Sequence, residues 1–208
     1  MREVSSGGLV RGGLACVTRG VWIKRAVTVV GGVASGGAMS AALASIASSS
    51  PSKRDVDVLN FALAFEELQA DFYARARRTL TLKSGWLQFV EVVGGHEREH
   101  VAFLRRALGS AAKPAPRLEL SRIPTTSTEF HRLAAGLEDV GVALYNGQAG
   151  NVTPQTLAAA AEIVSVEARH AAWARDLAGE VPAPVPTDAA ADAAEVKARL
   201  RQLGVHVG

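Results

Sequence analysis

The sequence predicts an all-α protein, a four-helix bundle in up-down-down-up order with a short fifth helix near its C-terminal end. Three observations favour this fold. Hydrophobic residues make up 48% of the 208 residues but aromatic residues only 5%, so the core is mostly alanine, leucine and valine, a composition that favours helices. Apolar residues recur at three- and four-residue steps in four long segments. The alternation typical of strands is scarce.

Residues 1–50 have the features of an export signal. A basic region precedes an uncharged stretch at 26–47 that is rich in small residues. The segment TRGVWIK at 18–24 resembles the twin-arginine export motif, with Gly20 in place of the second arginine. We therefore expect an exported protein of the periplasm or cell envelope, in which only this segment contacts a membrane. The alternatives are an uncleaved membrane anchor and a disordered tail on a cytoplasmic protein.

The first two helices are expected at 55–80 and 84–108, where the three-to-four spacing of apolar residues indicates amphipathic helices. Gly109 ends the second helix. The third helix is expected at 125–148. Thr153 as the cap and proline at the first helical position begin the fourth helix, which runs to residue 178.

The link at 110–124 determines the order of the bundle. It contains three prolines, which make it a poor helix. Its residues can span ~50 Å when extended, whereas a helix of about 24 residues is only ~36 Å long. The link can therefore cross the whole bundle, which makes the second and third helices parallel.

The chain thus divides into three parts. A proline-rich link at 181–186 leads to a short helix from about 187 to 203. The predicted parts are an export-signal-like or disordered segment at 1–50, the four-helix bundle at 51–180, and the linker with the short helix at 181–208.

Charged residues interrupt the apolar faces of the four helices in a repeated order. They are Glu66, then Glu97 and His100, then Glu138, then Glu167 and His170. The order Glu, Glu-x-x-His therefore occurs twice, and the chain looks like two copies of one helical hairpin. Glutamate and histidine three residues apart share a helix face, so both can reach one metal pair.

The only two tyrosines repeat the same pattern. Tyr73 and Tyr145 each follow a glutamate of the set, Glu66 or Glu138, by seven residues. Seven residues are nearly two turns, which places each tyrosine on the face of its glutamate, about 10 Å along the axis. We expect them beside the metal ligands, either as buried hydrogen-bonded phenols or as redox residues.

Four carboxylates inside a bundle require cations. Without them, repulsion and lost hydration would raise their pKa values steeply. Two divalent ions bring four positive charges and neutralise the site, and carboxylate oxygens with imidazole nitrogens suit iron or manganese. The predicted cofactors are therefore two divalent Fe or Mn ions.

Four stretches of the chain resemble the ferritin-like di-metal carboxylate proteins, and more narrowly the branch of desiccation-related and exported bacterial ferritin-like proteins. They are LNFALAFEELQADFY (59–73), HEREHVAFLRRALG (96–109), LEDVGVALYNGQA (137–149) and VEARHAAWARDLAG (166–179). All six ligand positions of the family pattern match. The resemblance implies bridging ligands at Glu97 and Glu167, terminal ligands at Glu66 and Glu138, and one metal each for His100 and His170.

The stretch HEREH at 96–100 also fits the zinc-protease motif H-E-x-x-H, with His96 and His100 on the metal and Glu97 as general base. That interpretation leaves the second hairpin unexplained. In its counterpart VEARH, Val166 stands where His96 does. We therefore expect Glu97 to be a ligand and His96 to be dispensable for metal binding.

Two further positions have alternative interpretations. Asp139, next to a predicted ligand, accepts a hydrogen bond from a ligand histidine or faces solvent. Gly94 and Gly95 leave room for a substrate or for a closely packed helix. Both alternatives stay open at the level of sequence.

These observations predict an exported di-iron or di-manganese protein that reacts with oxygen or peroxide in stress protection. The alternative is a non-enzymatic desiccation or envelope protein that at most sequesters metal. Basic residues spread along a chain of net charge +3, without an aromatic cluster, argue against nucleic-acid binding. One cysteine, Cys16, excludes an intrachain disulfide and a cysteine-based zinc site. The sequence sets no oligomeric state and allows a dimer.

Overall fold

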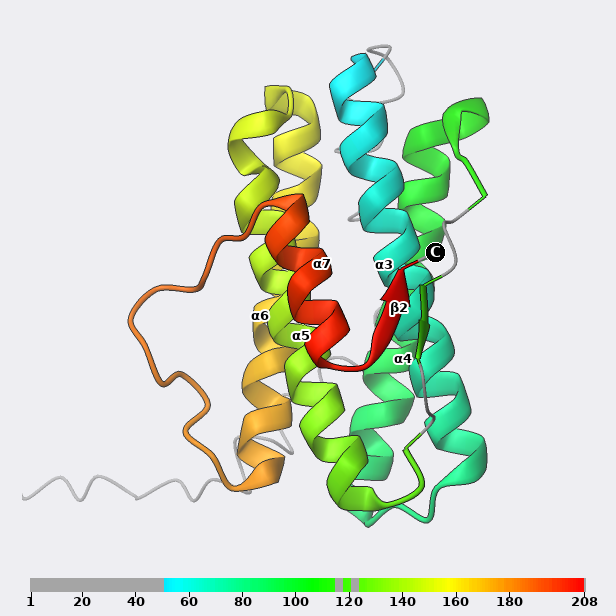
Figure 1. The fold of residues 1–208 in the computed structure, drawn as a ribbon, viewed down its shortest axis with the longest axis vertical. Coiled ribbons are helices and arrows are strands. Elements are labelled where there is room, and N and C mark those ends of the chain that lie inside the picture. The colour runs from blue at the N-terminus through cyan, green and yellow to red at the C-terminus, as the bar shows by residue number, and fades with distance from the viewer. Residues whose placement is uncertain (1–50, 115–117, 121–123, 208) are drawn as a thin grey trace, which may run out of the picture. The chain divides into compact units, whose positions relative to one another are not determined.

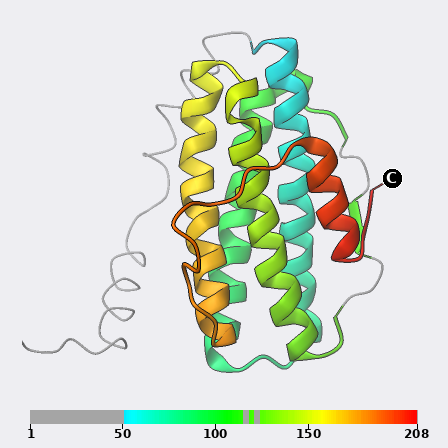
Figure 2. The same ribbon diagram turned by 60° about the vertical axis from the view of Figure 1, so that its left-hand side comes forward.

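A computed structural model describes residues 51–114, 118–120 and 124–207, which form the predicted all-α bundle (Figure 1). Its long helices are α3 (Lys53–Thr79), α4 (Ser84–Leu108), α5 (Ser127–Gln148) and α6 (Pro154–Ala178). Helices α4 and α5 run parallel, and α3 and α6 run opposite to them (Figures 1 and 2). The up-down-down-up prediction is therefore confirmed.

The predicted export signal, with Cys16 and Gly20, lies outside the described residues. Within the part of the chain that the structure describes, no helix is both long enough and apolar enough to cross a membrane.

The core lies between two hairpins, α3 with α4 and α5 with α6 (Figure 2). Aromatic side chains gather in one part of it. Phe72 stacks on Phe130 with a centroid distance of 5.3 Å, and Tyr73 meets Phe89 edge-on at 5.8 Å. This cluster joins three helices, and through Tyr73 it extends to the charged residues of the interior.

The starts of α3 and α6 are tied together by one buried carboxylate. Asp55 forms a capping box with Ser52, and it also accepts hydrogen bonds from the backbone N–H of Thr153 at 2.8 Å and from its hydroxyl at 3.1 Å. Thr153 is the predicted cap of α6, but its hydroxyl donates to Asp55 instead of accepting from its own helix. Burial alone would raise the pKa of Asp55, yet these hydrogen bonds outweigh it and lower that pKa.

The long crossover contains two short elements that the sequence pattern did not predict. A turn of 3-10 helix, η1 (Gly109–Ala111), follows α4, and strand β1 (Leu118–Leu120) comes after it. β1 pairs antiparallel with β2 (Val205–Val207) near the chain end. Three-residue strands are too short for alternation to reveal them.

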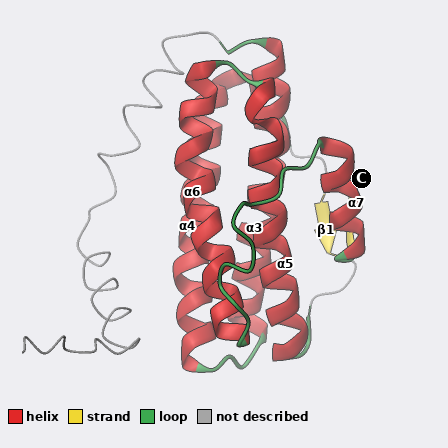
Figure 3. Ribbon diagram, turned by 90° about the vertical axis from the view of Figure 1, so that its left-hand side faces the viewer, coloured by secondary structure: helices red, strands yellow, loops and turns green. Residues whose placement is uncertain are grey.

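The fifth helix, α7 (Ala193–Gln202), is shorter than predicted at its start. Asp192 forms a capping box with Glu195 and accepts from the backbone N–H groups of Ala194 and Glu195. This cap fixes the beginning of the helix, so residues 187–191, which we expected to be helical, are not. The exposed segment 180–190 instead runs back along the outside of the bundle (Figure 3).

A glycine lets the C-terminal segment approach α5 closely. The backbone N–H of Ala191 donates to the carbonyl of Ala143 at 2.9 Å. A Cβ on Gly147 would lie 1.9 Å from the carbonyl oxygen of Ala191. Only a residue without a side chain fits at this contact.

Gly147→Ala is therefore expected to destabilise the protein, although alanine ordinarily favours a helix by ~1 kcal/mol. Overpacking against a backbone costs about 1–3 kcal/mol, and the segment before α7 should become sensitive to proteases. Urea unfolding and limited proteolysis measure both effects. Gly150→Ala is the control, because nothing lies within 4 Å of a Cβ there. Equal stability of the two variants would contradict the close contact.

Candidate metal centre

The structure brings all six predicted ligand side chains together in the interior of the bundle. Each of the four long helices contributes, α3 and α5 one glutamate each and α4 and α6 one Glu-x-x-His pair each. The four glutamates have no exposed surface, and His100 and His170 are only 5% and 3% exposed. Charged groups are rarely buried this completely unless they are paired or bind metal.

The six side chains form two overlapping groups in which one ligand atom per residue lies within 4.8 Å of all the others. We call them the His100 subsite (Glu66, Glu97, His100, Glu167) and the His170 subsite (Glu97, Glu138, Glu167, His170). Glu97 and Glu167 belong to both subsites. This is the arrangement that two cations need if they share two bridging carboxylates.

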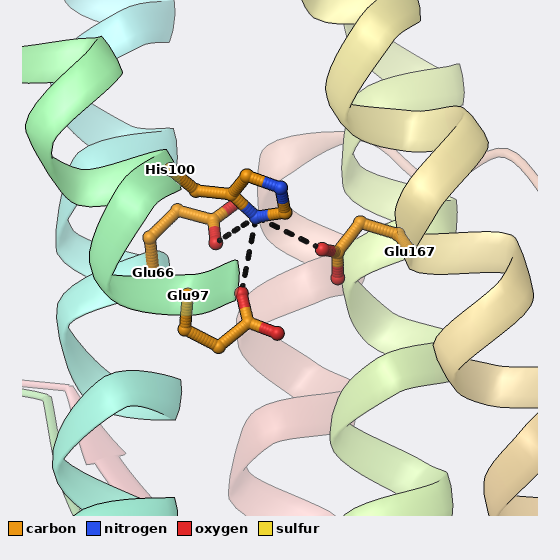
Figure 4. A group of neighbouring side chains, drawn as sticks. All are labelled: Glu66, Glu97, His100 and Glu167. Atoms are coloured by element: carbon orange, nitrogen blue, oxygen red, sulfur yellow. Dashed lines mark hydrogen bonds and ion pairs between the residues drawn. The ribbon is translucent and has the colours of Figure 1, made fainter. Parts of the chain in front are cut away.

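Each histidine directs its Nδ1 atom at three carboxylates. His100 Nδ1 lies 3.2 Å from Glu66 Oε2, 3.1 Å from Glu97 Oε2 and 3.3 Å from Glu167 Oε1. Figure 4 shows these three carboxylates around the ring. The i, i+3 spacing puts the histidine and the glutamate of each pair on one helix face.

The His170 subsite repeats this geometry. His170 Nδ1 lies 3.1 Å from Glu97 Oε1, 3.2 Å from Glu138 Oε2 and 3.6 Å from Glu167 Oε1. The two oxygens of Glu97 therefore face different subsites.

The residues present fit a pair of divalent cations. Five candidate ligand atoms are buried and make no hydrogen bond, although several of them lie close to one another: Glu97 Oε1, Glu138 Oε2, both oxygens of Glu167, and His170 Nδ1. Buried polar atoms normally find partners, because leaving them unpaired costs free energy. A cation would satisfy these atoms together, and the oxygen and nitrogen donor set suits iron or manganese.

The buried carboxylates shift one another's pKa values. Burial, and then repulsion from Glu167 and Glu138, raise the pKa of Glu97 well above its usual value. Burial and repulsion from Glu167 also raise the pKa of Glu138. Burial alone would raise the pKa of Glu167 as well, but the nearby imidazole rings of His100 and His170 outweigh it and lower that pKa to about 2. Glu167, a member of both subsites, therefore stays negatively charged at neutral pH.

The pKa values of the two histidines are raised although burial alone would lower them. Burial alone would lower the pKa of His170, but the facing carboxylates outweigh it and raise that pKa well above 6.5. The pKa of His100 is raised in the same way, chiefly by Glu66 against the effect of burial. A cation can bind at either Nδ1 only after displacing a proton.

Metal affinity is therefore expected to rise with pH. Because the pKa values of His100 and His170 are raised, both rings keep their protons at neutral pH and release them on metal binding. Each proton released makes the apparent affinity about tenfold higher per pH unit. Metal titrations between about pH 6 and pH 8, in two buffers of different ionisation enthalpy, measure the release. An affinity that does not change with pH would contradict this proton count.

The two tyrosines lie beside the ligands, but each contacts the glutamate of the opposite hairpin. The hydroxyl of Tyr73 donates to Glu138 Oε1, and that of Tyr145 donates to Glu66 Oε1 at 2.5 Å. Burial, followed by the adjacent glutamates, raises the pKa of both tyrosines well above 10. Both therefore remain neutral phenols that fix one oxygen of each terminal glutamate.

Two residues around the centre were missed by the sequence reasoning. Gln69 is fully buried and donates from Nε2 to Glu138 Oε1 at 3.0 Å. A polar residue three positions after Glu66 on the same apolar face was a usable signal. Gly141 faces Glu167, where a Cβ would lie 2.7 Å from its Oε2 atom. Its position three residues after Glu138 carries no signal of its own.

The structure decides two of the open alternatives. Asp139 accepts no hydrogen bond from a histidine among the described residues; it is partly exposed and forms an ion pair with Arg175. Gly94 accommodates a closely packed helix, because its Cβ position lies 3.0 Å from the Cβ of Tyr73.

His96 belongs to neither subsite. Its Nδ1 lies 2.9 Å from Nε2 of His170, on the side of that ring away from the carboxylates. Burial, and then the neighbouring His170, lower the pKa of His96 to about 4, so its ring is neutral at pH 7. Among the described residues, no group that could hold a metal ion contains both His96 and His100, as a zinc-protease motif requires.

The chain resembles a known protein family. A family profile described as a ferritin-like domain matches residues 54–180, more than half of the chain. The matched range contains all six residues of the two subsites. No curated protein is significantly similar to the chain.

Proposed function

The chain belongs to the ferritin-like domain family, and from this premise we propose that it holds two iron or manganese ions and reacts with dioxygen or peroxide. The observation that carries the proposal is the set of ligand atoms buried without hydrogen-bond partners around the shared carboxylates of Glu97 and Glu167. Such a set is costly in a folded protein unless cations complete it.

Each residue of the centre has a distinct part in the proposal. Glu97 and Glu167 bridge the two subsites, and Glu66 and Glu138 each serve one. Tyr145 and Tyr73 hold the outer oxygens of these two glutamates, which leaves the other oxygen for the ligand histidine and its cation. Ligands fixed in this way keep their geometry when the charge in the site changes.

Two bound iron or manganese ions supply redox chemistry toward dioxygen or peroxide. The protein contributes an interior closed to bulk solvent, because the four glutamates have no exposed surface. The phenols of Tyr73 and Tyr145 each hold a proton at the outer oxygen of Glu138 and Glu66, respectively.

We place this activity in the cell envelope as part of stress protection. The proposal rests on the signal-like composition of residues 1–50 and on the resemblance to exported and desiccation-related proteins. Fractionation of cells that express the full chain tests it. Retention of the protein in the cytoplasm with an intact N-terminus would rule the location out.

Metal analysis of the purified full chain, followed by oxygen and peroxide consumption assays, tests the proposed activity. We expect two metal ions per chain after reconstitution and consumption of at least one oxidant. Fewer than one ion per chain would refute the di-metal centre. Two ions without oxidant consumption would instead identify a sequestering protein, the non-enzymatic alternative.

A further inference from the structure

His96 is a half-buried histidine that belongs to neither subsite. It lies one residue before Glu97 on α4 and reaches across to α6. Its Nδ1 atom is 2.9 Å from His170 Nε2, and the two ring planes lie within 16° of each other. A hydrogen bond therefore joins the two rings.

The direction of this bond follows from the chemistry of the subsite. His170 Nδ1 faces three carboxylates at 3.1–3.6 Å, so this nitrogen is the one that would bind a cation. An imidazole that binds through Nδ1 carries its remaining proton on Nε2. His170 Nε2–H is thus the donor and His96 Nδ1 the acceptor. The contact fixes both the tautomer and the rotation of the His170 ring.

The other subsite has no counterpart of this contact. By the internal repeat, the position equivalent to His96 is Val166, which has no acceptor in its side chain. Among the described residues, the side-chain hydrogen bonds of His100 all involve Nδ1. The two subsites therefore have matching ligands but different support behind their histidines.

We propose that His96 is a positioning residue that holds His170 ready for its cation and makes the His170 subsite the tighter of the two. This inference rests on the proposed di-metal function. A ring already held in the binding tautomer and orientation loses less freedom when the ion binds. Such outer hydrogen-bond partners typically contribute 10–100-fold to metal affinity. Metal should therefore bind in two steps, first at the His170 subsite.

The test uses Mn²⁺ as the probe metal and the full chain. Free Mn²⁺ is followed by electron paramagnetic resonance during a titration. The wild type should bind two ions with unequal affinities. His96→Val, which installs the residue of the equivalent position, should weaken the tighter step by about 10–100-fold and leave the other step unchanged.

Two further variants distinguish a positioning role of His96 from a general effect of the substitution on the fold. His96→Asn keeps an acceptor close to the Nδ1 position and should restore most of the lost affinity. His206→Val makes the same change at an exposed residue of β2 and should leave both steps unchanged. Circular dichroism establishes that each variant is folded.

The outcomes distinguish this inference from the proposed function. A wild type that binds no Mn²⁺ refutes the di-metal centre itself. Two unequal steps that persist unchanged in His96→Val overturn the role of His96 alone. Loss of both ions in that variant would make His96 a direct ligand and also overturn it. If His96→Val does not fold, the ¹⁵N spectrum of the wild-type imidazoles decides, and a His170 without a hydrogen-bonded Nε2–H refutes the inference.

Discussion

Replacing Glu97 by glutamine is expected to empty both subsites at once. Its Oε2 atom lies 3.1 Å from His100 Nδ1 and its Oε1 atom 3.1 Å from His170 Nδ1, so one carboxylate serves both cations. An amide keeps the shape, but it has only one oxygen acceptor and no charge. The metal content measured after reconstitution should fall from two ions per chain to fewer than one.

The same substitution should stabilise the protein when a chelator is present. Burial and repulsion from Glu167 and Glu138 raise the pKa of Glu97. A carboxyl group with a raised pKa binds its proton more tightly in the folded state. Its contribution to stability therefore becomes less favourable as the pH rises above the unfolded value. Glutamine carries no charge at any of these pH values and avoids this cost.

At pH 7 and in chelator, Glu97→Gln should therefore unfold at a higher temperature than the wild type. A gain of ~1 kcal/mol corresponds to about 2–4 °C for a domain of this size. Glu99→Gln is the matched control, because Glu99 lies two residues further along α4 and is exposed. It should change neither metal content nor Tm. A Glu97→Gln variant that binds two ions, or that is less stable in chelator, would contradict the bridging role.

The grouping of the six candidate ligands could be predicted because their pattern occurs twice in the sequence. A single Glu-x-x-His on a helix is uninformative, but two copies, each preceded by a glutamate about thirty residues earlier, fix four helix faces toward one interior. The structure brings these residues together as two subsites that share Glu97 and Glu167. The spacing of residues along each helix was sufficient for this prediction, because residues separated by about one helical turn lie on the same face.

Contacts between helices could not be read in the same way. The sequence placed each tyrosine on the helix face of its own glutamate, about 10 Å along the axis, but did not identify the glutamate that it contacts. Tyr73 contacts Glu138 and Tyr145 contacts Glu66. Which glutamate each tyrosine contacts depends on how far α3 is shifted along α5. That shift depends in turn on packing contacts between helices, such as those at Gly141. His96 likewise has no equivalent in the second hairpin, and its distance from His170 depends on how α4 lies against α6.

Short elements were missed for a different reason. β1 and β2 exist only as a pair, and the chain positions that form them are far apart. The start of α7 depends on which of several acidic residues becomes the cap, and Asp192 does so with Glu195. Local sequence propensity does not determine the strand pairing or the first residue of α7, because both depend on tertiary contacts.

Removing the metal ions with a chelator is expected to lower the Tm of the wild type by more than ~10 °C. A ligand present at 1,000 times its Kd stabilises the folded state by ~4 kcal/mol per site. Two such sites in a chain of this length correspond to a shift of that size or larger. The physical origin is that the cations pair the buried atoms of Glu97, Glu138, Glu167 and His170, which are costly when unpaired.

Scanning calorimetry of the wild type and of Glu97→Gln, each with Mn²⁺ and with chelator, separates this effect from nonspecific ones. The wild type should show the large shift, and the variant should show almost none, because it has lost the sites but keeps the fold. In Mn²⁺ the wild type should therefore have the higher Tm, and in chelator Glu97→Gln should have the higher Tm. A shift of equal size in both proteins would mean that the ions stabilise the chain somewhere other than between the four long helices.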